Sequence, residues 1–317
     1  MQFINSLLHI KEIEKIMLQY FRIEDVKCHL LRSYRNEIYV IASFGRKYIF
    51  KIYNALKPKE DVVFETSYMD FLNRKETIAN MPVKAVDNKY YIELEFPEGK
   101  RYAVLFEYNN GVELDYNKAS DALIYGKSVA KLHLASKDYK PSYSKETNVF
   151  QLFIDATNKL ELFFTKYKNE QWVYLDNYLN KVTGKITTID TNKMLMGYIH
   201  ADLHGGNYLL HDKEMFFYDF EYSGFGLICY ELSVFRWSTL IGNREDQWTI
   251  FLKGYRSLID ISDHELHHSL VMVCIRDALI LANTVSMADK FGISSIHNYY
   301  IQNRLQFIKK MTNILQI

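Results

Sequence analysis

Glycine and proline are scarce in this 317-residue chain, which holds 13 Gly and 4 Pro. Their combined share is well below the roughly 12% that is average for proteins, so we expect few long loops without structure. Cysteine is scarce too, and Cys28, Cys229 and Cys274 lie far apart without paired spacing. This distribution argues against a disulfide framework and a cysteine-rich zinc site, and it favours a reducing compartment.

The chain has little net charge and no long apolar run. A formal charge of +1 and a pI near 7.7 give no reason to expect nucleic acid or an anionic membrane as a partner. No unbroken apolar run approaches the ~18 residues of a membrane span. Charges from Lys11 onward argue against a signal peptide. We therefore expect a cytoplasmic protein.

The most informative stretch is GYIHADLHGGNYLLHDKEMFFYDFEY, residues 197–222. Two short apolar runs, 208–210 and 215–218, flank a polar turn and predict a β-hairpin. Asn207 and Asp219 stand at the open end of this hairpin. Asp202 precedes Asn207 across a turn that two glycines make easy. We therefore expect one amide and two carboxylates to converge.

Phosphoryl transfer from a nucleotide uses such a set. One Asp accepts the proton of the attacking hydroxyl, while an Asn and a second Asp hold magnesium against the phosphates. The order His200-x-Asp202-Leu-x-x-x-Asn207 has the spacing of the protein-kinase catalytic loop, with Ala201 in place of Arg. Asp219 begins an Asp-Phe-Glu triplet where those kinases have Asp-Phe-Gly.

Two charged residues stand where apolar ones are expected. Lys51 lies within the predicted strand 47–53, which is apolar on both faces, and Glu65 lies on the apolar stripe of the predicted helix 59–73. A Lys51–Glu65 ion pair that holds the lysine against the α- and β-phosphates explains both positions. The alternative is a lysine that reaches solvent and a glutamate at the edge of its stripe.

Further strands are predicted at 26–31, 37–42, 81–95 and 100–108, after a leading helix at 8–21. The turn between the first two strands, residues 31–37, carries no glycine. Protein kinases cover the phosphates with a glycine-rich loop. Here either Ser33, Tyr34 and Arg35 present backbone N–H groups, or Arg35 contacts a phosphate directly, or the turn is stiff and the nucleotide is weakly held.

The strings HADLHGGNYLL, YDFEYSGFG and YEL resemble the aminoglycoside phosphotransferase and choline kinase family. The resemblance runs from about Lys27 to Trp237. Ala201 stands where the family usually has Gly, and Glu231 where it more often has Asp. The glycine that the family usually has in the first turn is also missing.

The resemblance implies an α+β, bilobal protein-kinase-like fold. We expect a small antiparallel β lobe at 1–108, which binds nucleotide, and a large, mainly helical lobe at 109–317, which carries catalysis and substrate binding. The implied activity is transfer of the γ-phosphoryl group of ATP or GTP, with Mg²⁺, to a hydroxyl of a small acceptor. Aminoglycosides, choline, amino sugars and homoserine are candidate acceptors, and some of these bear an amine.

The expected roles follow the motifs. Asp202 is the base, and Asn207 and Asp219 are the magnesium ligands. Lys51, held by Glu65, binds the nucleotide phosphates. By resemblance to kinases, the adenine lies beside Glu107 and Tyr108, although an ordinary strand-to-helix turn explains that junction equally well. Glu221 contacts a metal-bound water, and His200 and His204 support the loop.

Two features bear on the acceptor. Fewer than ten residues separate Asp219 from the predicted helix 227–240, which leaves no room for an activation segment, so no protein substrate is expected. Four side chains offer a wall for an ammonium group or, equally, part of the core. They are Tyr222, Tyr230, Glu231 and Trp237.

His133, on the predicted helix 117–136, is expected to be a core histidine.

Two other classes of function stay open. Asp202-x-His204 with nearby histidines suggests a two-metal phosphoesterase, but that class needs further His and Asp clusters and leaves the Lys51–Glu65 pair unexplained. A non-catalytic or catalytically weak scaffold, such as a spore-coat-type homologue, fits the turn without glycine. ATP binding would separate a scaffold from a kinase.

Overall fold

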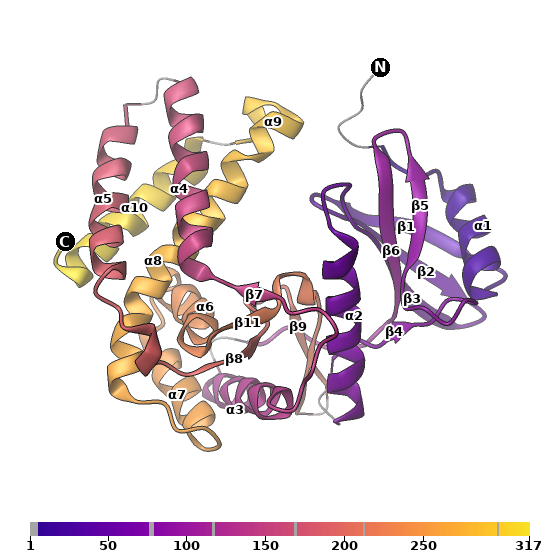
Figure 1. The fold of residues 1–317 in the computed structure, drawn as a ribbon, viewed down its shortest axis with the longest axis horizontal. Coiled ribbons are helices and arrows are strands. Elements are labelled where there is room, and N and C mark those ends of the chain that lie inside the picture. Colours follow the sequence, from indigo (N-terminus) through magenta and orange to yellow (C-terminus); the bar gives the residue numbers. More distant parts are fainter. Residues whose placement is uncertain (1–5, 76–78, 116–117, 168–169, 212, 297) are drawn as a thin grey trace. The chain divides into compact units, whose positions relative to one another are not determined.

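The computed structural model describes residues 6–75, 79–115, 118–167, 170–211, 213–296 and 298–317. The chain divides into two compact units, whose elements Figure 1 labels. Unit 1 comprises Met1–Leu114, Leu134–Lys145 and Asn207–Glu221; unit 2 comprises Asp115–His133, Glu146–Gly206 and Tyr222–Ile317. The lobes predicted at 1–108 and 109–317 stay a prediction. The compact units follow other boundaries, because segments 134–145 and 207–221 belong with the N-terminal sheet.

Unit 1 is built on an antiparallel sheet in the order β1-β2-β3-β6-β4, with β5 also paired to β6. The first three strands are confirmed to within two residues of their predicted ends. The strands are β1 (Lys27–Ser33), β2 (Glu37–Ser43), β3 (Arg46–Ile52), β4 (Pro82–Val83), β5 (Ile92–Phe96) and β6 (Gly99–Glu107).

One face of this sheet packs against α1 (Ile10–Phe21) and forms the core of unit 1 (Figure 1). Alternate strand residues point to the same face, so the apolar residues that alternate along β2, β3 and β6 gather on one side. α2 (Lys59–Arg74) follows β3 and carries Glu65 on its buried side. The core includes Ile13, Met17, Tyr39, Ile41, Phe50, Ile52, Ala103 and Leu105.

The prediction of one continuous strand at 81–95 is wrong in its middle. Only β4 and β5 form, and between them the N–H of Ala85 donates to the carbonyl of Lys89 at 2.8 Å. Asn88 has a φ of 67° in this turn. Asparagine tolerates the left-handed region better than most residues, and its local hydrogen bonding favours a turn over a strand.

Unit 2 is mainly helical. A small sheet of β7 (Glu146–Thr147), β11 (Gly224–Leu227) and β8 (Met196–Ile199), in that order, accompanies the helices. The predicted helices 117–136 and 227–240 correspond to α3 and α6, and residue 117 lies outside the described residues. The helices are α3 (Ala119–Ser136, whose last turn falls in unit 1), α4 (Val149–Lys166), α5 (Trp172–Ile186), α6 (Ile228–Ile241), α7 (Glu245–Arg256), α8 (Asp263–Val285), α9 (Met287–Phe291) and α10 (Asn298–Leu315).

Within the described part of the chain, α8 alone is long and apolar enough to cross a membrane, with a mean hydropathy of 1.4 over 18 residues. Of that window, 67% is buried inside the protein, as expected for a core helix. The search of the sequence for an unbroken apolar run missed this helix.

Candidate active site

The predicted hairpin is confirmed, and it places Asn207 and Asp219 at its open end. β9 (Tyr208–His211) pairs antiparallel with β10 (Glu214–Phe217). The N–H of Tyr218 donates to the carbonyl of Asn207 at 3.0 Å. Asp219 follows with a φ of 63°, a conformation that Asp adopts at lower cost than most residues. The two candidate magnesium ligands therefore start from neighbouring, fixed backbone positions.

The predicted ion pair between Lys51 and Glu65 is present and buried. Nζ of Lys51 lies 3.2 Å from Oε1 of Glu65, and the two side chains are 5% and 0% exposed. The same ammonium group lies 2.7 Å from Oδ1 of Asp219 and 3.4 Å from Oε2 of Glu221. Lys51 is thus shared by three carboxylates. Strand β3 contributes Lys51, opposite Val104 of β6, and helix α2 contributes Glu65.

The charges in this cluster shift one another's pKa. Burial lowers the pKa of Lys51, but the carboxylates of Asp219 and Glu65 outweigh it and hold the pKa well above the ordinary value. Burial raises the pKa of Glu65, and the negative charges of Asp219 and Glu221 raise it as well. The positive charge of Lys51 acts in the opposite direction. Lys51 therefore stays charged throughout the physiological range, as a phosphate-binding lysine must.

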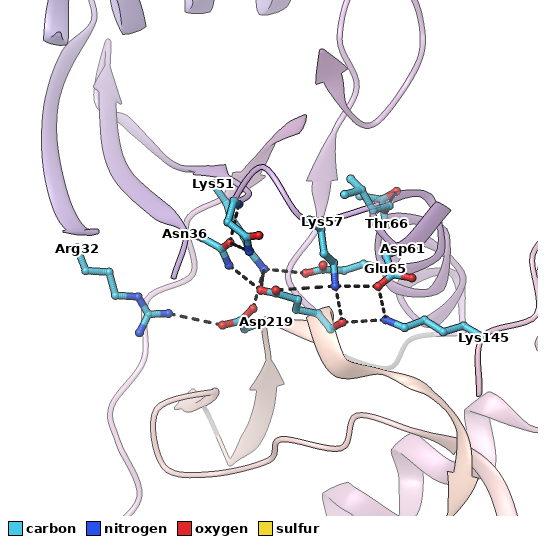
Figure 2. Close-up of polar contacts among 12 residues, drawn as sticks. Arg32, Asn36, Lys51, Lys57, Asp61, Glu65, Thr66, Lys145 and Asp219 are labelled. Atoms are coloured by element: carbon cyan, nitrogen blue, oxygen red, sulfur yellow. Dashed lines mark hydrogen bonds and ion pairs between the residues drawn. The ribbon is translucent and has the colours of Figure 1, made fainter. Parts of the chain in front are cut away.

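A second group of charges lies beside this cluster and was not predicted (Figure 2). Lys57 and Lys145 donate to the backbone carbonyl of Glu221 at 3.0 and 2.8 Å. Both lie near Oδ2 of Asp61, at 3.0 and 3.4 Å. The Glu221 carboxylate accepts from Nδ2 of Asn36 at 2.6 Å. No sequence pattern distinguishes these two lysines from exposed ones.

Asp219 and Asn207 offer donors that fit magnesium. Figure 2 shows Arg32 and Lys51 both directed at Asp219, with Nη2 of Arg32 3.5 Å from Oδ2. Among the described residues, no group of three His, Cys, Asp or Glu side chains is placed to hold a metal ion. Magnesium needs only one or two carboxylates, because waters and substrate phosphates complete its shell. The Asp219 carboxylate, 23% exposed, and the Asn207 amide oxygen supply the hard oxygen donors that this ion prefers.

The predicted adenine site at Glu107 and Tyr108 lies at the end of β6. The backbone N–H of Glu107 donates to the carbonyl of Met81 at 2.9 Å, and that of Tyr108 to the carbonyl of Lys47 at 3.3 Å. Glu107 pairs with Tyr48, three residues from Lys51 along β3, which is about 10 Å of strand. The role of Glu107 and Tyr108 beside an adenine stays a prediction.

Asp202, the predicted base, belongs to unit 2, whereas Asn207 and Asp219 belong to unit 1. The convergence of all three therefore stays a prediction. Within unit 2, Oδ1 of Asp202 pairs with Nη2 of Arg276 from α8. Nε2 of His204 lies 3.7 Å from Oδ2 of Asp202. Sequence reasoning missed Arg276, which lies 74 residues away from Asp202.

Glu231 braces the loop that carries Asp202. Its carboxylate accepts the backbone N–H of His200 at 3.1 Å and that of Ala201 at 2.6 Å. Burial raises the pKa of Glu231 to about 8, although these two hydrogen bonds act in the opposite direction. Ala201 has a φ of 66°, a left-handed conformation that glycine adopts more readily. The brace therefore maintains a strained loop conformation next to the candidate base.

Of the four residues offered as an ammonium-binding wall or, equally, as core, Glu231 and Tyr230 are core residues. Glu231 is 2% exposed, and its carboxylate accepts backbone groups. The Trp237 ring lies 6.0 and 5.5 Å from the guanidinium carbons of Arg276 and Arg304. Its indole N–H donates to Asp277 at 2.9 Å. The Trp237 ring thus already faces two arginines, each of which pairs with an acid, Asp202 or Asp277.

The expectation for His133 is confirmed. His133 is 5% exposed and its Nδ1 lies 2.9 Å from the hydroxyl of Tyr255 on α7. Burial lowers the pKa of His133 to about 3. It is therefore a neutral core histidine of unit 2.

An antiparallel sheet with a buried Lys–Glu pair, an Asp at the start of an Asp-Phe-Glu triplet, and a braced His-x-Asp loop define a kinase-like phosphotransferase. The model of the APH family, the phosphotransferase enzyme family, matches residues 29–260. The chain belongs to this family and is a small-molecule phosphotransferase of the kinase type.

Comparison with single proteins agrees with this assignment. Amicoumacin kinase of Bacillus subtilis is 20% identical over 242 residues, which cover 71% of this chain and 70% of that protein. The structure of amicoumacin kinase hAmiN, in complex with AMP-PNP, Ca²⁺ and Ami, has a TM-score of 0.80 at 18% identity and covers 96% of this chain and 94% of its own. Choline kinase LicA of Streptococcus pneumoniae has a TM-score of 0.67 at 14% identity, with 96% and 100% covered. The predicted α+β protein-kinase-like fold is confirmed.

Proposed function

We propose that the protein is an ATP-dependent kinase that transfers the γ-phosphoryl group to a hydroxyl of a small acceptor. The observation that carries this proposal is the buried Lys51, shared by Glu65, Asp219 and Glu221. A buried lysine between the acid of a helix and a candidate metal ligand is the arrangement that positions nucleotide phosphates in kinases. The AMP-PNP in hAmiN supports a nucleoside triphosphate as donor, and GTP is the alternative.

The proposed roles divide between the units. In unit 1, Lys51 binds the α- and β-phosphates, and Asn207 and Asp219 hold Mg²⁺, which when bound neutralises charge on the phosphates. Glu107 and Tyr108 adjoin the adenine. In unit 2, Asp202 accepts the proton of the acceptor hydroxyl, and its carboxylate is oriented by Arg276.

The acceptor is proposed as a small alcohol. Aminoglycoside-, choline-, amino sugar- and homoserine-like compounds are the candidates that the family resemblance implies, and an aminoglycoside phosphotransferase and a choline kinase are among the similar solved structures. Two acids of unit 2, the partly exposed Asp202 and the buried Asp277, each pair with an arginine. An ammonium acceptor would therefore compete with Arg276 for Asp202. Neutral and anionic alcohols belong in the same screen.

We further propose a cytoplasmic location, with a nucleotide and a small alcohol as partners. The connection from Asp219 to α6, which begins at Ile228, is too short for the activation segment on which protein kinases dock substrates. No role with nucleic acid, membrane or a protein substrate is proposed.

A non-catalytic scaffold is the second candidate, favoured by the first turn without glycine. Isothermal titration with ATP and Mg²⁺, followed by ATP turnover against a library of alcohols, separates the two. A kinase binds ATP and phosphorylates at least one alcohol, whereas a scaffold does neither.

Asp202→Asn then tests the assignment of the base. We expect turnover to fall by about 10²- to 10⁴-fold while ADP affinity is kept, because Asp202 lies outside the nucleotide-binding unit. Asp260→Asn, an exposed aspartate of unit 2, is the matched control and should match wild type. Unchanged turnover in Asp202→Asn would refute the assignment.

A further inference from the structure

The turn between β1 and β2 lacks glycine, yet one of its side chains is buried. Asn36 is 8% exposed. Its Nδ2 donates to Oε2 of Glu221 at 2.6 Å, and its Oδ1 accepts the N–H of Asn54 at 3.1 Å. A single amide therefore joins the turn, the segment after β3 and the Asp-Phe-Glu triplet, where Asn36 and Glu221 are 185 residues apart in sequence.

The Glu221 side of this contact is held firmly. Its side chain is 7% exposed and lies 3.4 Å from Nζ of Lys51 and 3.8 Å from Nζ of Lys57. Lys57 and Lys145 also bind its backbone carbonyl. A carboxylate with these partners is a strong acceptor for the Asn36 amide, since hydrogen bonds to charged groups are shorter and stronger than neutral ones. Moving it toward a metal ion would break the Asn36 contact.

From this geometry we infer that the Asn36–Glu221 hydrogen bond is a latch that fixes the β1–β2 turn against the Asp-Phe-Glu segment in the nucleotide-free protein. The inference rests on the proposed function, because the turn held in this way is the one that covers the nucleotide phosphates in kinases. The latch fixes the conformation of the β1–β2 turn, at the position where protein kinases have a glycine-rich loop. Asn36 and Glu221 are thus positioning residues for the nucleotide, and Glu221 does not need to reach the metal.

A reciprocal exchange tests the latch. Asn36→Asp places a second carboxylate beside that of Glu221, so the contact loses its donor. Glu221→Gln places a second amide beside that of Asn36, so the contact loses its charged acceptor. The double variant with both changes restores one donor and one acceptor, in the opposite order and with unchanged net charge. We expect each single change to weaken ADP binding about ten-fold, the equivalent of one hydrogen bond to a charged group. The double variant should return to within about three-fold of wild type.

ADP affinity is measured by isothermal titration with EDTA present, so that the metal ligands do not contribute. Asn177→Asp, at an exposed asparagine of α5, is the matched control and should bind ADP like wild type. Hydrogen exchange of residues 33–36 gives a second measurement that does not depend on affinity. We expect protection without nucleotide in wild type, loss of protection in both single variants, and recovery in the double variant.

The outcomes separate the latch from the proposed function. Wild type that fails to bind ADP both in EDTA and in Mg²⁺ overturns both; if it binds only in Mg²⁺, the same comparison of variants is made there. Wild type that binds ADP, with single variants equal to it or a double variant no better than the singles, overturns the latch alone. Protection of 33–36 that appears only after ADP is added also overturns it, because the latch must exist in the free protein.

Discussion

Lys51→Met removes the one ammonium group that three carboxylates share. Nζ lies 2.7 Å from Asp219, 3.2 Å from Glu65 and 3.4 Å from Glu221. Methionine keeps much of the chain length and the apolar contacts of the lysine stem, so the change isolates the charge. In the variant, Glu65 has no other ion-pair partner within 4.0 Å among the described residues.

Breaking a buried ion pair by removing one partner costs about 3–5 kcal/mol. We therefore expect unit 1 to lose about 4 kcal/mol of unfolding free energy at pH 7. Without Lys51, the folded-state pKa of Glu65, which burial already raises, rises further above its unfolded value. Stability from such groups is present at low pH and is lost as pH rises, so the deficit should be larger at pH 8 than at pH 5. Glu65→Gln, which leaves Lys51 with two carboxylates, should cost less.

The assay must report on unit 1 separately. All three tryptophans, Trp172, Trp237 and Trp248, lie in unit 2, so their fluorescence follows unit 2 during urea unfolding. Hydrogen exchange of β3 and α2 amides follows unit 1. Lys27→Met, at an exposed residue of β1, is the matched control. The reasoning is refuted if Lys51→Met and Lys27→Met have the same stability in unit 1, or if the Lys51→Met deficit grows as pH falls.

Three further predictions concern unit 2. Glu231→Gln leaves one backbone N–H of the catalytic loop facing an amide NH₂ group, so we expect kcat to fall at least ten-fold with ADP affinity unchanged. Arg276→Met frees the Asp202 carboxylate from its partner and should lower kcat about 10²-fold, with partial recovery in Arg276→Lys. Because His133 has a folded-state pKa of about 3 against an ordinary value of 6.5, its contribution to stability is complete above pH 6.5 and falls on acidification. Wild type should lose about 2 kcal/mol between pH 7.5 and 5 from this group, and His133→Asn should not.

Each of these has a contrary result. Wild-type kcat in Glu231→Gln would mean that the loop conformation does not depend on the brace. Equal kcat for the Met and Lys variants at Arg276 would exclude a role for the positive charge. Equal acid sensitivity of wild type and His133→Asn, measured by urea unfolding at both pH values, would show that another group is responsible.

The local parts of the site could be predicted from the sequence because short-range periodicity carries them. Lys51 and Glu65 are charged residues at buried positions of a strand and a helix only 14 residues apart, so each pointed to the other. Asn207 and Asp219 flank a hairpin whose two apolar runs fix which residues are neighbours. The single strand predicted at 81–95 was wrong because that prediction relied on periodicity alone. A turn around Asn88 has no strong periodic signal.

Contacts between distant segments depended on the tertiary structure. The pairing of Asn36 with Glu221 spans 185 residues, and that of Asp202 with Arg276 spans 74. Glu231 looked like one face of an ammonium site, but folding turned its carboxylate to the backbone N–H groups of the catalytic loop.

The sequence by itself determined the fold class, the family and the residues that are candidates for phosphoryl transfer, because spacing along one strand, helix or hairpin specifies them. Only the tertiary structure decided which charges neutralise Asp202, Asp219 and Glu221. A buried charge takes the partner that packing brings within a few ångströms, and no local pattern records which distant segment that will be.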